Sequence, residues 1–466
     1  MQFNKKILHV LIAVCLLFLS LTVYLTYFVL FPSAEVAQSP YDRRSWKKED
    51  SVMRGTIYDK DGEKLAYSQM DGDTQVRVYP YGGLYTHVIG FNSRTYGKSQ
   101  LELKFNDQLI GEGGLGAVVS LADRLAGGEK RGADLHLTID HDLQSVASAQ
   151  LGKRNGAVVA MNPKTGAVEV MVSTPTYDPS AAALKENWPA LAEREDAPFL
   201  NRATSGLYAP GSTFKVVTAA AAIEQNLADE TFMDKGSVTI GGKEFVNQGG
   251  KVHGEIDVTR GFAVSSNVVF TQLAAQMGAD VMQDAAGRFG LNKQISFDLP
   301  TETASFPAGA MSEVEIAAAG IGQGKVLVTP LSMAMIAASV ANDGVMMNPY
   351  LVDYAAFANG VKSYSAVQQK IGTPITSSVA SVLQDMMAEC VKSGTGTAAR
   401  VAGLDVYGKT GTAENERGKD HSWFIGYCED ESGEQLAVAI ILEYNGQGGG
   451  AACAPIAQKI FAQWAK

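Results

Sequence analysis

Three short strings in this chain carry side chains that suit acyl transfer through a serine. Ser212-Thr213-Phe214-Lys215 supplies a hydroxyl nucleophile and an amine, and Ser265-Ser266-Asn267 supplies a second hydroxyl and an amide. Lys409-Thr410-Gly411-Thr412 adds a cation, two hydroxyls and a strand backbone. Each string is short enough to arise by chance, so the prediction depends on their order and on their combination.

Ser212 and Lys215 form the predicted catalytic pair. Pro210 and Gly211 precede an apolar run, which predicts a helix that begins at the serine. Residues at i and i+3 share a helix face, about 5–6 Å apart at Cβ. Burial and the positive end of the helix would both lower the pKa of the lysine from its usual value of about 10.4. A neutral Lys215 could then take the Ser212 proton as the hydroxyl attacks a carbonyl.

Ser265 and Asn267 lie roughly 50 residues further along the chain. On its own, such a string is typical of a helix cap or a turn. Its position on a separate segment after the nucleophile favours a functional interpretation. Ser265 could relay a proton to the leaving amine, and Asn267 could hold a substrate amide.

Lysine-threonine-glycine occurs twice, and its surroundings identify the functional copy. Lys164-Thr165-Gly166 lies in a predicted hairpin turn ahead of the nucleophile. The copy that starts at Lys409 continues an apolar strand and is followed by a second strand. Residues 403–410 also match the P-loop pattern G-x-x-x-x-G-K-[ST], but a P-loop requires a long helix after its threonine, and polar residues 414–420 follow here.

The strand around Lys409 is predicted to bind substrate. Lys409 and the hydroxyls of Thr410 and Thr412 suit a carboxylate, and Gly411 allows a ligand backbone to lie against the strand. The backbone N–H groups of Ser212 and Thr412 are natural donors for an oxyanion hole.

The predicted secondary structure places these strings in one α/β unit. Residues 157–161 and 167–172 are apolar runs joined by turn residues, which is typical of a β-hairpin. Strands near both ends with helices between them predict an antiparallel sheet flanked by helices. The other predicted elements are helices at 214–224, 264–277, 330–341 and 377–391, strands at 422–428 and 436–443, and a last helix at 455–464.

The region ahead of this unit is predicted to be smaller and rich in β-structure. Its short strand-like runs are broken by glycines, and Asp59-Lys60-Asp61-Gly62 is a turn signal between two of them. The predicted strands lie at 56–58, 75–78, 87–89 and 135–139.

Composition excludes some classes of function. The net charge of −10 argues against nucleic acid as the main partner. The histidines are scattered and the cysteines show no metal-ligand spacing, so no metal site is predicted. Cys390, Cys428 and Cys453 are expected to be buried, apolar side chains, with at least one thiol left unpaired among them.

The N-terminal segment is predicted to be a membrane anchor. From Ile7 to Leu30 the chain is apolar apart from a few polar residues without a fixed charge. This stretch of about 24 residues is roughly 36 Å long as a helix, which is enough to cross a bilayer's hydrocarbon core. Lys5 and Lys6 favour a cytoplasmic N-terminus. Arg43, Arg44, Lys47 and Lys48 beyond the span favour the opposite orientation, so the expectation that the globular part lies outside the cell membrane rests partly on function.

Four further segments carry a family resemblance. Arg54 to Asp59 is similar to an R-G-x-I-x-D motif, and Gly97 to Gly111 is similar to a G-x-x-G-L-E-x-x-F-N-D segment with Ser99-Gln100 where its second glycine is expected. Gly322-Gln323-Gly324 and His421 to Gly426 resemble transpeptidase-domain signatures. With the three strings above, they make the chain resemble the class B penicillin-binding proteins, bacterial cell-wall transpeptidases. The short penicillin-binding protein A type is the most similar in length and layout.

The resemblance implies a fold and an activity. It implies a cytoplasmic tail at 1–6, an anchor at 7–31, a pedestal or dimerisation-like domain at 32–155, and a serine β-lactamase-like transpeptidase domain at 156–466. Ser212 would be acylated by a D-Ala-D-Ala stem peptide and would pass the acyl group to an amine of another strand, and β-lactams would acylate the same serine. No cofactor or metal is implied. A SEDS-family membrane glycosyltransferase is the expected partner.

Two alternatives share the same three strings. A D,D-carboxypeptidase would pass the acyl group to water, and a membrane-anchored β-lactam sensor would acylate without cross-linking. The pedestal favours the transpeptidase. The sequence does not indicate whether the enzyme serves elongation, division or sporulation, or which amine is the acceptor.

Overall fold

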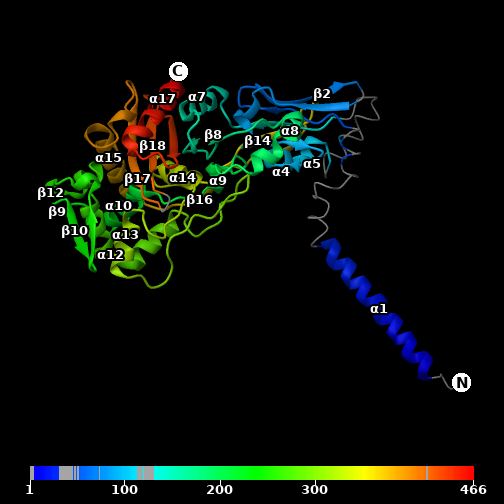
Figure 1. The fold of residues 1–466 in the computed structure, drawn as a ribbon, viewed down its shortest axis with the longest axis horizontal. Coiled ribbons are helices and arrows are strands. Elements are labelled where there is room, and N and C mark those ends of the chain that lie inside the picture. Colours follow the sequence, from blue (N-terminus) through cyan, green and yellow to red (C-terminus); the bar gives the residue numbers. More distant parts are fainter. Residues whose placement is uncertain are drawn as a thin grey trace.

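The computed structural model describes residues 5–30, 46, 49, 52–72, 74–112, 119, 131–415 and 418–466. Residues 1–4 of the predicted tail and residues 31–45 lie outside the described residues. At the N-terminal end, α1 (Lys5–Leu30) is a helix of 26 residues (Figure 1). Among the described residues, no helix combines the length and the apolar character that crossing a bilayer requires. The anchor stays a prediction.

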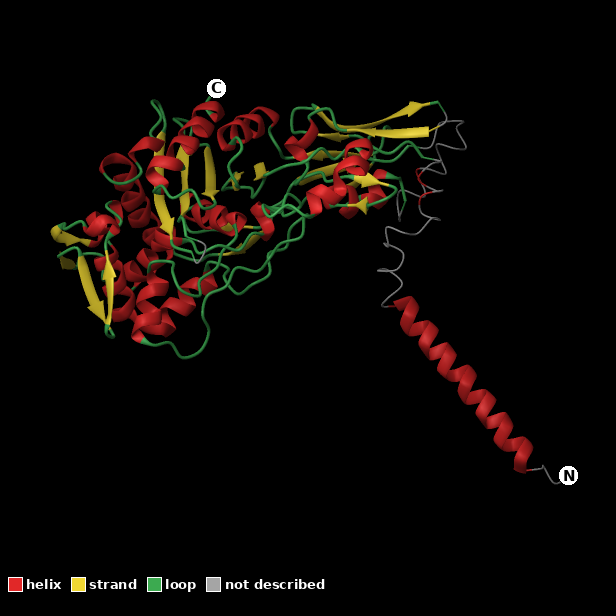
Figure 2. Ribbon diagram, in the orientation of Figure 1, coloured by secondary structure: helices red, strands yellow, loops and turns green. Residues whose placement is uncertain are grey.

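A five-stranded antiparallel sheet forms the centre of the larger globular part (Figures 1 and 2). It brings the two ends of this part together, because strands from the start of the unit pair with strands from its end. The sheet and its hairpin are therefore as predicted. In spatial order the strands are β17 (Asp405–Ala413), β18 (His421–Glu429), β19 (Gln435–Leu442), β7 (Gly156–Met161) and β8 (Val168–Thr174).

The central strands are apolar along nearly their whole length because both faces of the sheet are covered. Successive side chains of a strand point to opposite faces. In β18, Trp423, Ile425 and Tyr427 join one core cluster, whereas Phe424 and Cys428 join the other. Continuous apolar runs of this kind are expected where no face meets water.

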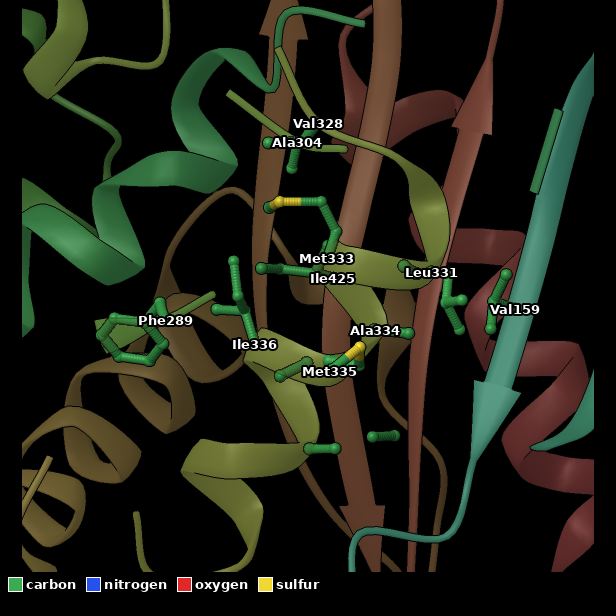
Figure 3. Close-up of a cluster of buried hydrophobic side chains, with 14 of the residues drawn as sticks. Val159, Phe289, Ala304, Val328, Leu331, Met333, Ala334, Met335, Ile336 and Ile425 are labelled. Carbon is green, nitrogen blue, oxygen red and sulfur yellow. The ribbon is translucent and has the colours of Figure 1, made fainter. Parts of the chain in front are cut away.

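Helices supply both covering layers. Every residue of α14 is buried against the first face, and Figure 3 shows Leu331 and Met333 of this helix beside Val159 and Ile425 of the sheet. All five predicted helices are confirmed. On the first face, α14 (Pro330–Ala341) contacts β7, β18 and β19, and α15 (Ser377–Ser393) contacts β17. α10 (Lys215–Glu224) packs against α15, and α12 (Asn267–Arg288) packs against α10. The second layer holds α7 (His141–Leu151) and α17 (Ala454–Trp464).

The smaller part is built on a six-stranded sheet that recruits strands from both regions of the chain. Its order is β15-β14-β6-β1-β2-β3, with β1 and β6 parallel and the other pairs antiparallel. After α14 the chain therefore returns to the pedestal, and Figure 1 shows β14 beside the pedestal helices. The strands are β1 (Ile57–Tyr58), β2 (Lys64–Asp71), β3 (Thr74–Val78), β6 (Asp134–Leu137), β14 (Val352–Ala356) and β15 (Lys362–Ser365).

One predicted pedestal strand, at 87–89, is wrong. This segment continues the helical turn of η1 (Gly82–Tyr85), since the Ile89 N–H donates to the Tyr85 carbonyl at 2.7 Å. Val88 and Ile89 are completely buried in this turn. A short apolar run does not distinguish a buried strand from a buried helical turn.

The three cysteines of the globular part are as predicted. Cys390, Cys428 and Cys453 are buried and form no disulfide. Burial raises the pKa of the Cys428 and Cys453 thiols above their ordinary range, so they serve as small apolar side chains.

Shorter elements complete the fold. Two small hairpin-like pairs, β9–β12 and β10–β11, stand beside α12 (Figure 1). The remaining bounds are β4 (Asn92–Ser93), β5 (Gly97–Lys98), α4 (Gln100–Lys104), α5 (Asn106–Leu109), α8 (Ala181–Ala192), α9 (Arg202–Ser205), η2 (Gly211–Phe214), β9 (Thr231–Asp234), β10 (Ser237–Ile240), β11 (Lys243–Val246), η3 (Gln248–Gly250), β12 (Gly254–Asp257), α11 (Val258–Ala263), α13 (Glu313–Gly320), β13 (Met346–Met347), β16 (Lys370–Gly372), η4 (Thr397–Ala399) and α16 (Gly449–Ala452).

Candidate active site

Ser212 lies in the tight turn η2, directly ahead of α10. Gly211 has a φ of +53°, and a Cβ at this position would lie 2.3 Å from the Thr412 carbonyl oxygen. Only glycine therefore lets η2 pack against β17. Gly322 supports the same turn from behind, because its carbonyl accepts a hydrogen bond from the Gly211 N–H at 2.9 Å.

Lys215 is the first residue of α10 and its side chain is completely buried. Its Nζ donates to the Ser265 carbonyl oxygen at 2.8 Å and to Asn267 Oδ1 at 2.9 Å. Burial, followed by the positive charge of Lys409, lowers the pKa of Lys215 well below its ordinary value, and Asp234 opposes this shift. The neutral amine that a general base requires is therefore favoured.

Ser265 occupies the short connection between α11 and α12 in a strained conformation. Its φ of +63° lies in the left-handed region, which non-glycine residues rarely adopt. The Ser265 hydroxyl oxygen lies 2.9 Å from Lys409 Nζ and 3.4 Å from Lys215 Nζ. The structure thus brings all three predicted strings together at this one hydroxyl.

Lys409 lies in the middle of β17 and is completely buried. Besides Ser265, its Nζ contacts the Thr410 carbonyl oxygen at 3.0 Å. Burial lowers the pKa of Lys409 to about 8, so the amine remains largely cationic at neutral pH. A lysine in mid-strand is also incompatible with a P-loop, in which it would precede a helix.

The remaining residues of the strand differ in exposure. The Thr410 hydroxyl points to the protein interior, where it contacts Thr395 Oγ1 at 2.5 Å. The Thr412 hydroxyl is partly open and lies 3.5 Å from Gln248 Nε2. Gly411 packs against the nucleophile turn, since a Cβ there would lie 2.9 Å from Thr213 Cγ2. Of the two threonine hydroxyls, Thr412 is therefore the better placed to meet a substrate.

Asn267 is already engaged on both sides of its amide. Its Oδ1 accepts from Lys215, and its Nδ2 donates to the Val246 carbonyl oxygen at 2.8 Å. Two residues that contact this segment, Asp234 and Asn247, are not identified by any pattern in the sequence. Neither belongs to a recognisable string, and their partners lie on other segments.

Two family profiles match the two globular parts. The penicillin binding protein transpeptidase domain matches residues 156–462. The penicillin binding protein A dimerisation domain matches residues 54–135.

Curated relatives are similar over nearly the whole chain. Peptidoglycan D,D-transpeptidase PbpA of Mycolicibacterium smegmatis is 32% identical, with 98% of each chain covered. The protein of the same name from Mycobacterium tuberculosis is 31% identical over the same shares. Peptidoglycan D,D-transpeptidase MrdA of Acinetobacter baumannii is 31% identical over 84% of this chain and 66% of its own.

Solved structures share the fold. The imipenem acyl-enzyme complex of penicillin-binding protein A from M. tuberculosis has a TM-score of 0.85 at 30% identity, covering 90% of this chain and 99% of its own. A D,D-transpeptidase domain from Eggerthella lenta has a TM-score of 0.80 at 36% identity, covering 89% and 98%.

Proposed function

The chain belongs to the penicillin-binding protein transpeptidase family, and on this premise we propose how its residues act. It is a peptidoglycan D,D-transpeptidase, a serine acyltransferase that β-lactams acylate, and its fold is the α/β transpeptidase fold with an N-terminal dimerisation domain. One observation carries the assignment of roles. The Ser265 hydroxyl lies between the buried amines of Lys215 and Lys409, and Lys215 directly follows the turn that holds Ser212.

Acylation begins when the Ser212 oxygen attacks the carbonyl of the penultimate D-alanine of a stem peptide. Neutral Lys215 accepts the hydroxyl proton, and a tetrahedral oxyanion forms. The peptide bond then breaks, and the leaving amine of D-alanine receives a proton through Ser265. The products are the Ser212 ester and free D-alanine.

Transfer to the acceptor reverses these proton movements. An amine of a neighbouring strand attacks the Ser212 ester and loses a proton to the Lys215–Ser265 pair. The ester bond breaks, the serine oxygen regains its proton, and a new peptide bond joins the two strands. A β-lactam enters at the first step, and its amide bond opens to leave the drug as an ester on the serine.

Backbone donors and β17 orient the substrate in this proposal. The contact between Gly211 and the Thr412 carbonyl places the nucleophile turn against β17, which supports an oxyanion hole formed by the N–H groups of Ser212 and Thr412. The Thr412 hydroxyl and Lys409, with Thr410 and Gly411 shaping the strand, would orient the terminal carboxylate. Asn267 would bind the peptide amide, and its hydrogen bond with Lys215 would give way in part to one with the substrate.

A fluorescent penicillin tests the site. The wild-type protein should be labelled covalently, and peptide mass spectrometry should place the adduct on Ser212. Ser212→Ala should abolish labelling, whereas Ser432→Ala, which alters an exposed turn, should not. Labelling that persists in the Ser212→Ala protein would overturn the assignment.

We further propose that α1 anchors the enzyme in the cell membrane, with domains at 32–155 and 156–466 on the outside. The apolar sequence of residues 7–30 and the exposure of its side chains, such as Leu17 at 66%, support this placement. Since a dimerisation domain precedes the transpeptidase domain, glycan polymerisation is assigned to a partner, a SEDS-family membrane glycosyltransferase.

Exchange of the helix tests both parts of this proposal. Replacing residues 7–30 by an unrelated span should preserve membrane association and penicillin labelling while impairing cell-wall growth, because packing between membrane helices depends on particular faces. Full complementation at native expression would show that the helix serves only as a tether. Recovery of the wild-type protein in the soluble fraction would contradict anchoring itself.

A further inference from the structure

A buried carboxylate stands behind the strained turn of the active site. Asp234 ends β9 and its side chain is completely buried. Its oxygens accept hydrogen bonds from Ser266 Oγ at 2.6 Å, from Asn247 Nδ2 at 2.8 Å and from the Gly236 N–H at 2.8 Å. A buried charge is tolerated only when it is satisfied in this way.

Asn247 extends the contact to the backbone of the same turn. Its Oδ1 accepts from the Asn267 N–H at 2.8 Å and from the Val268 N–H at 3.2 Å. Ser266, the other partner of Asp234, caps α12 by accepting from the Val269 N–H at 3.1 Å. The carboxylate thus fixes both the side chain and the backbone on the C-terminal side of Ser265.

The conformation of Ser265 requires such support. Its left-handed backbone persists only where the surroundings determine it, because a non-glycine residue relaxes from this region when it is free to do so. A small rotation here would move its hydroxyl away from Lys215 or Lys409.

We propose that Asp234 and Asn247 are positioning residues of the transpeptidase, which hold the Ser265–Asn267 turn so that the Ser265 hydroxyl stays between the two amines. This inference rests on the proposed roles of Ser212, Lys215 and Ser265. It adds an electrostatic consequence, because the same carboxylate that fixes the turn also acts on the general base.

The electrostatic effect on Lys215 depends on the groups that surround its amine. β17 contributes the charge of Lys409 and β9 contributes that of Asp234. α12 faces Lys215 with Asn267 Oδ1, 2.9 Å from Nζ, and with the ring of Phe270, whose centre lies 5.5 Å from Nζ. On α11 the ring of Phe262 faces Lys409, and on α15 the thiol of Cys390 acts on Lys409.

The sign of the effect follows from these charges. Burial and the positive charge of Lys409 lower the pKa of Lys215, whereas the negative charge of Asp234 raises it. Removing the carboxylate charge therefore lowers the pKa of Lys215. Since acylation needs the neutral amine, the acidic limb of its pH profile moves to lower pH.

The rate of acylation by a fluorescent penicillin, measured from pH 5 to 9, separates positioning from general stability. Asp234→Asn should lower the plateau rate by about tenfold to a hundredfold, the loss expected from misplacing a reacting group by about 1 Å, and should move the acidic limb to lower pH. Ser266→Ala retains the charge, so it should lower the plateau without moving the limb. Glu102→Gln alters a buried carboxylate in α4 of the pedestal. It should lower the melting temperature but change neither the plateau rate nor the acidic limb.

Each outcome decides the question. A wild-type plateau in folded Asp234→Asn, an unmoved limb, or an equal plateau loss in Glu102→Gln would each overturn the proposal. If Asp234→Asn does not fold, Ser266→Ala decides alone, because wild-type acylation by that variant would show that the turn needs no such support. Absence of labelling in the wild-type protein would instead contradict the proposed function.

Discussion

Replacing Lys215 by arginine tests the general base, because it puts a permanent cation where the proposed mechanism requires a neutral amine. Arginine stays protonated in proteins, so Lys215→Arg has no lone pair to accept the Ser212 proton. The Ser265 carbonyl and Asn267 Oδ1, which now accept from Lys215, would still find donors on a guanidinium. The substitution therefore removes the proton acceptor and keeps the partners of the site.

The magnitude follows from the lost proton transfer. Positioned general bases contribute roughly 10²–10⁴-fold, which corresponds to about 3 to 5 kcal/mol of barrier. We expect the second-order rate of penicillin acylation to fall by this factor at every pH between 6 and 9. Lys409→Arg should cost less, because Lys409, with a pKa of about 8, acts as a cation at neutral pH, and arginine remains one.

Stopped-flow labelling gives the rates, and thermal unfolding establishes that each variant is folded. Lys185→Arg alters an exposed lysine of α8 and serves as the control for lysine-to-arginine exchange. A folded Lys215→Arg protein that loses less than tenfold, or that loses no more than Lys409→Arg, would refute the assignment of Lys215 as the base.

Three further predictions concern stability. In Gly322→Ala the new Cβ would lie 2.1 Å from the Gly211 carbonyl oxygen, on a backbone with φ of +70°, so we expect a loss of about 2 kcal/mol or more in urea unfolding, together with slower acylation. Burial opposes the ionisation of Glu102, but two arginines hold its pKa at about 2. The contribution of the ionised Glu102 to the stability of the fold should be present above pH 4.5 and lost as the pH falls towards 2. This acid dependence should vanish in Glu102→Gln. Burial raises the pKa of Glu169 to about 7, so stability should decrease as pH rises from 4.5 to 7, and Glu169→Gln should flatten this decrease. Denaturant midpoints that do not follow these pH windows would contradict the last two predictions.

The sequence is sufficient to predict those strands and helices whose pattern of apolar residues shows which of their faces are buried. The apolar runs of β18 and β19 predict strands with both faces covered, and the alanine-rich run of α14 predicts a buried helix. The three strings also identify the residues that meet at Ser265. The predictions of these strands and of this helix succeed because each depends on a pattern within one segment.

Features that depend on distant segments are not visible in the sequence. The pairing of β14 with β6 joins residues 352–356 to residues 134–137, and no local pattern specifies this partner. Asp234 is one acidic residue among many until the fold places Ser266 and Asn247 against it. The left-handed Ser265 is likewise unexpected, because its side chain gives no preference for that conformation.

The hydrogen bonds of Lys215 are compatible with the neutral amine that the proposed mechanism requires. A neutral amine has two hydrogens and one lone pair, and the structure offers two well-placed acceptors, the Ser265 carbonyl at 2.8 Å and Asn267 Oδ1 at 2.9 Å. An ammonium would need a third acceptor, and the Ser265 hydroxyl at 3.4 Å is a poor one. That hydroxyl instead accepts from Lys409 at 2.9 Å, whose pKa of about 8 keeps it protonated at neutral pH. In the proposed mechanism, Lys409 is therefore the cation that holds the Ser265 hydroxyl, and the lone pair of neutral Lys215 accepts the proton of Ser212. The proton that D-alanine carries away can then come from within the site, so acylation needs no proton from the solvent.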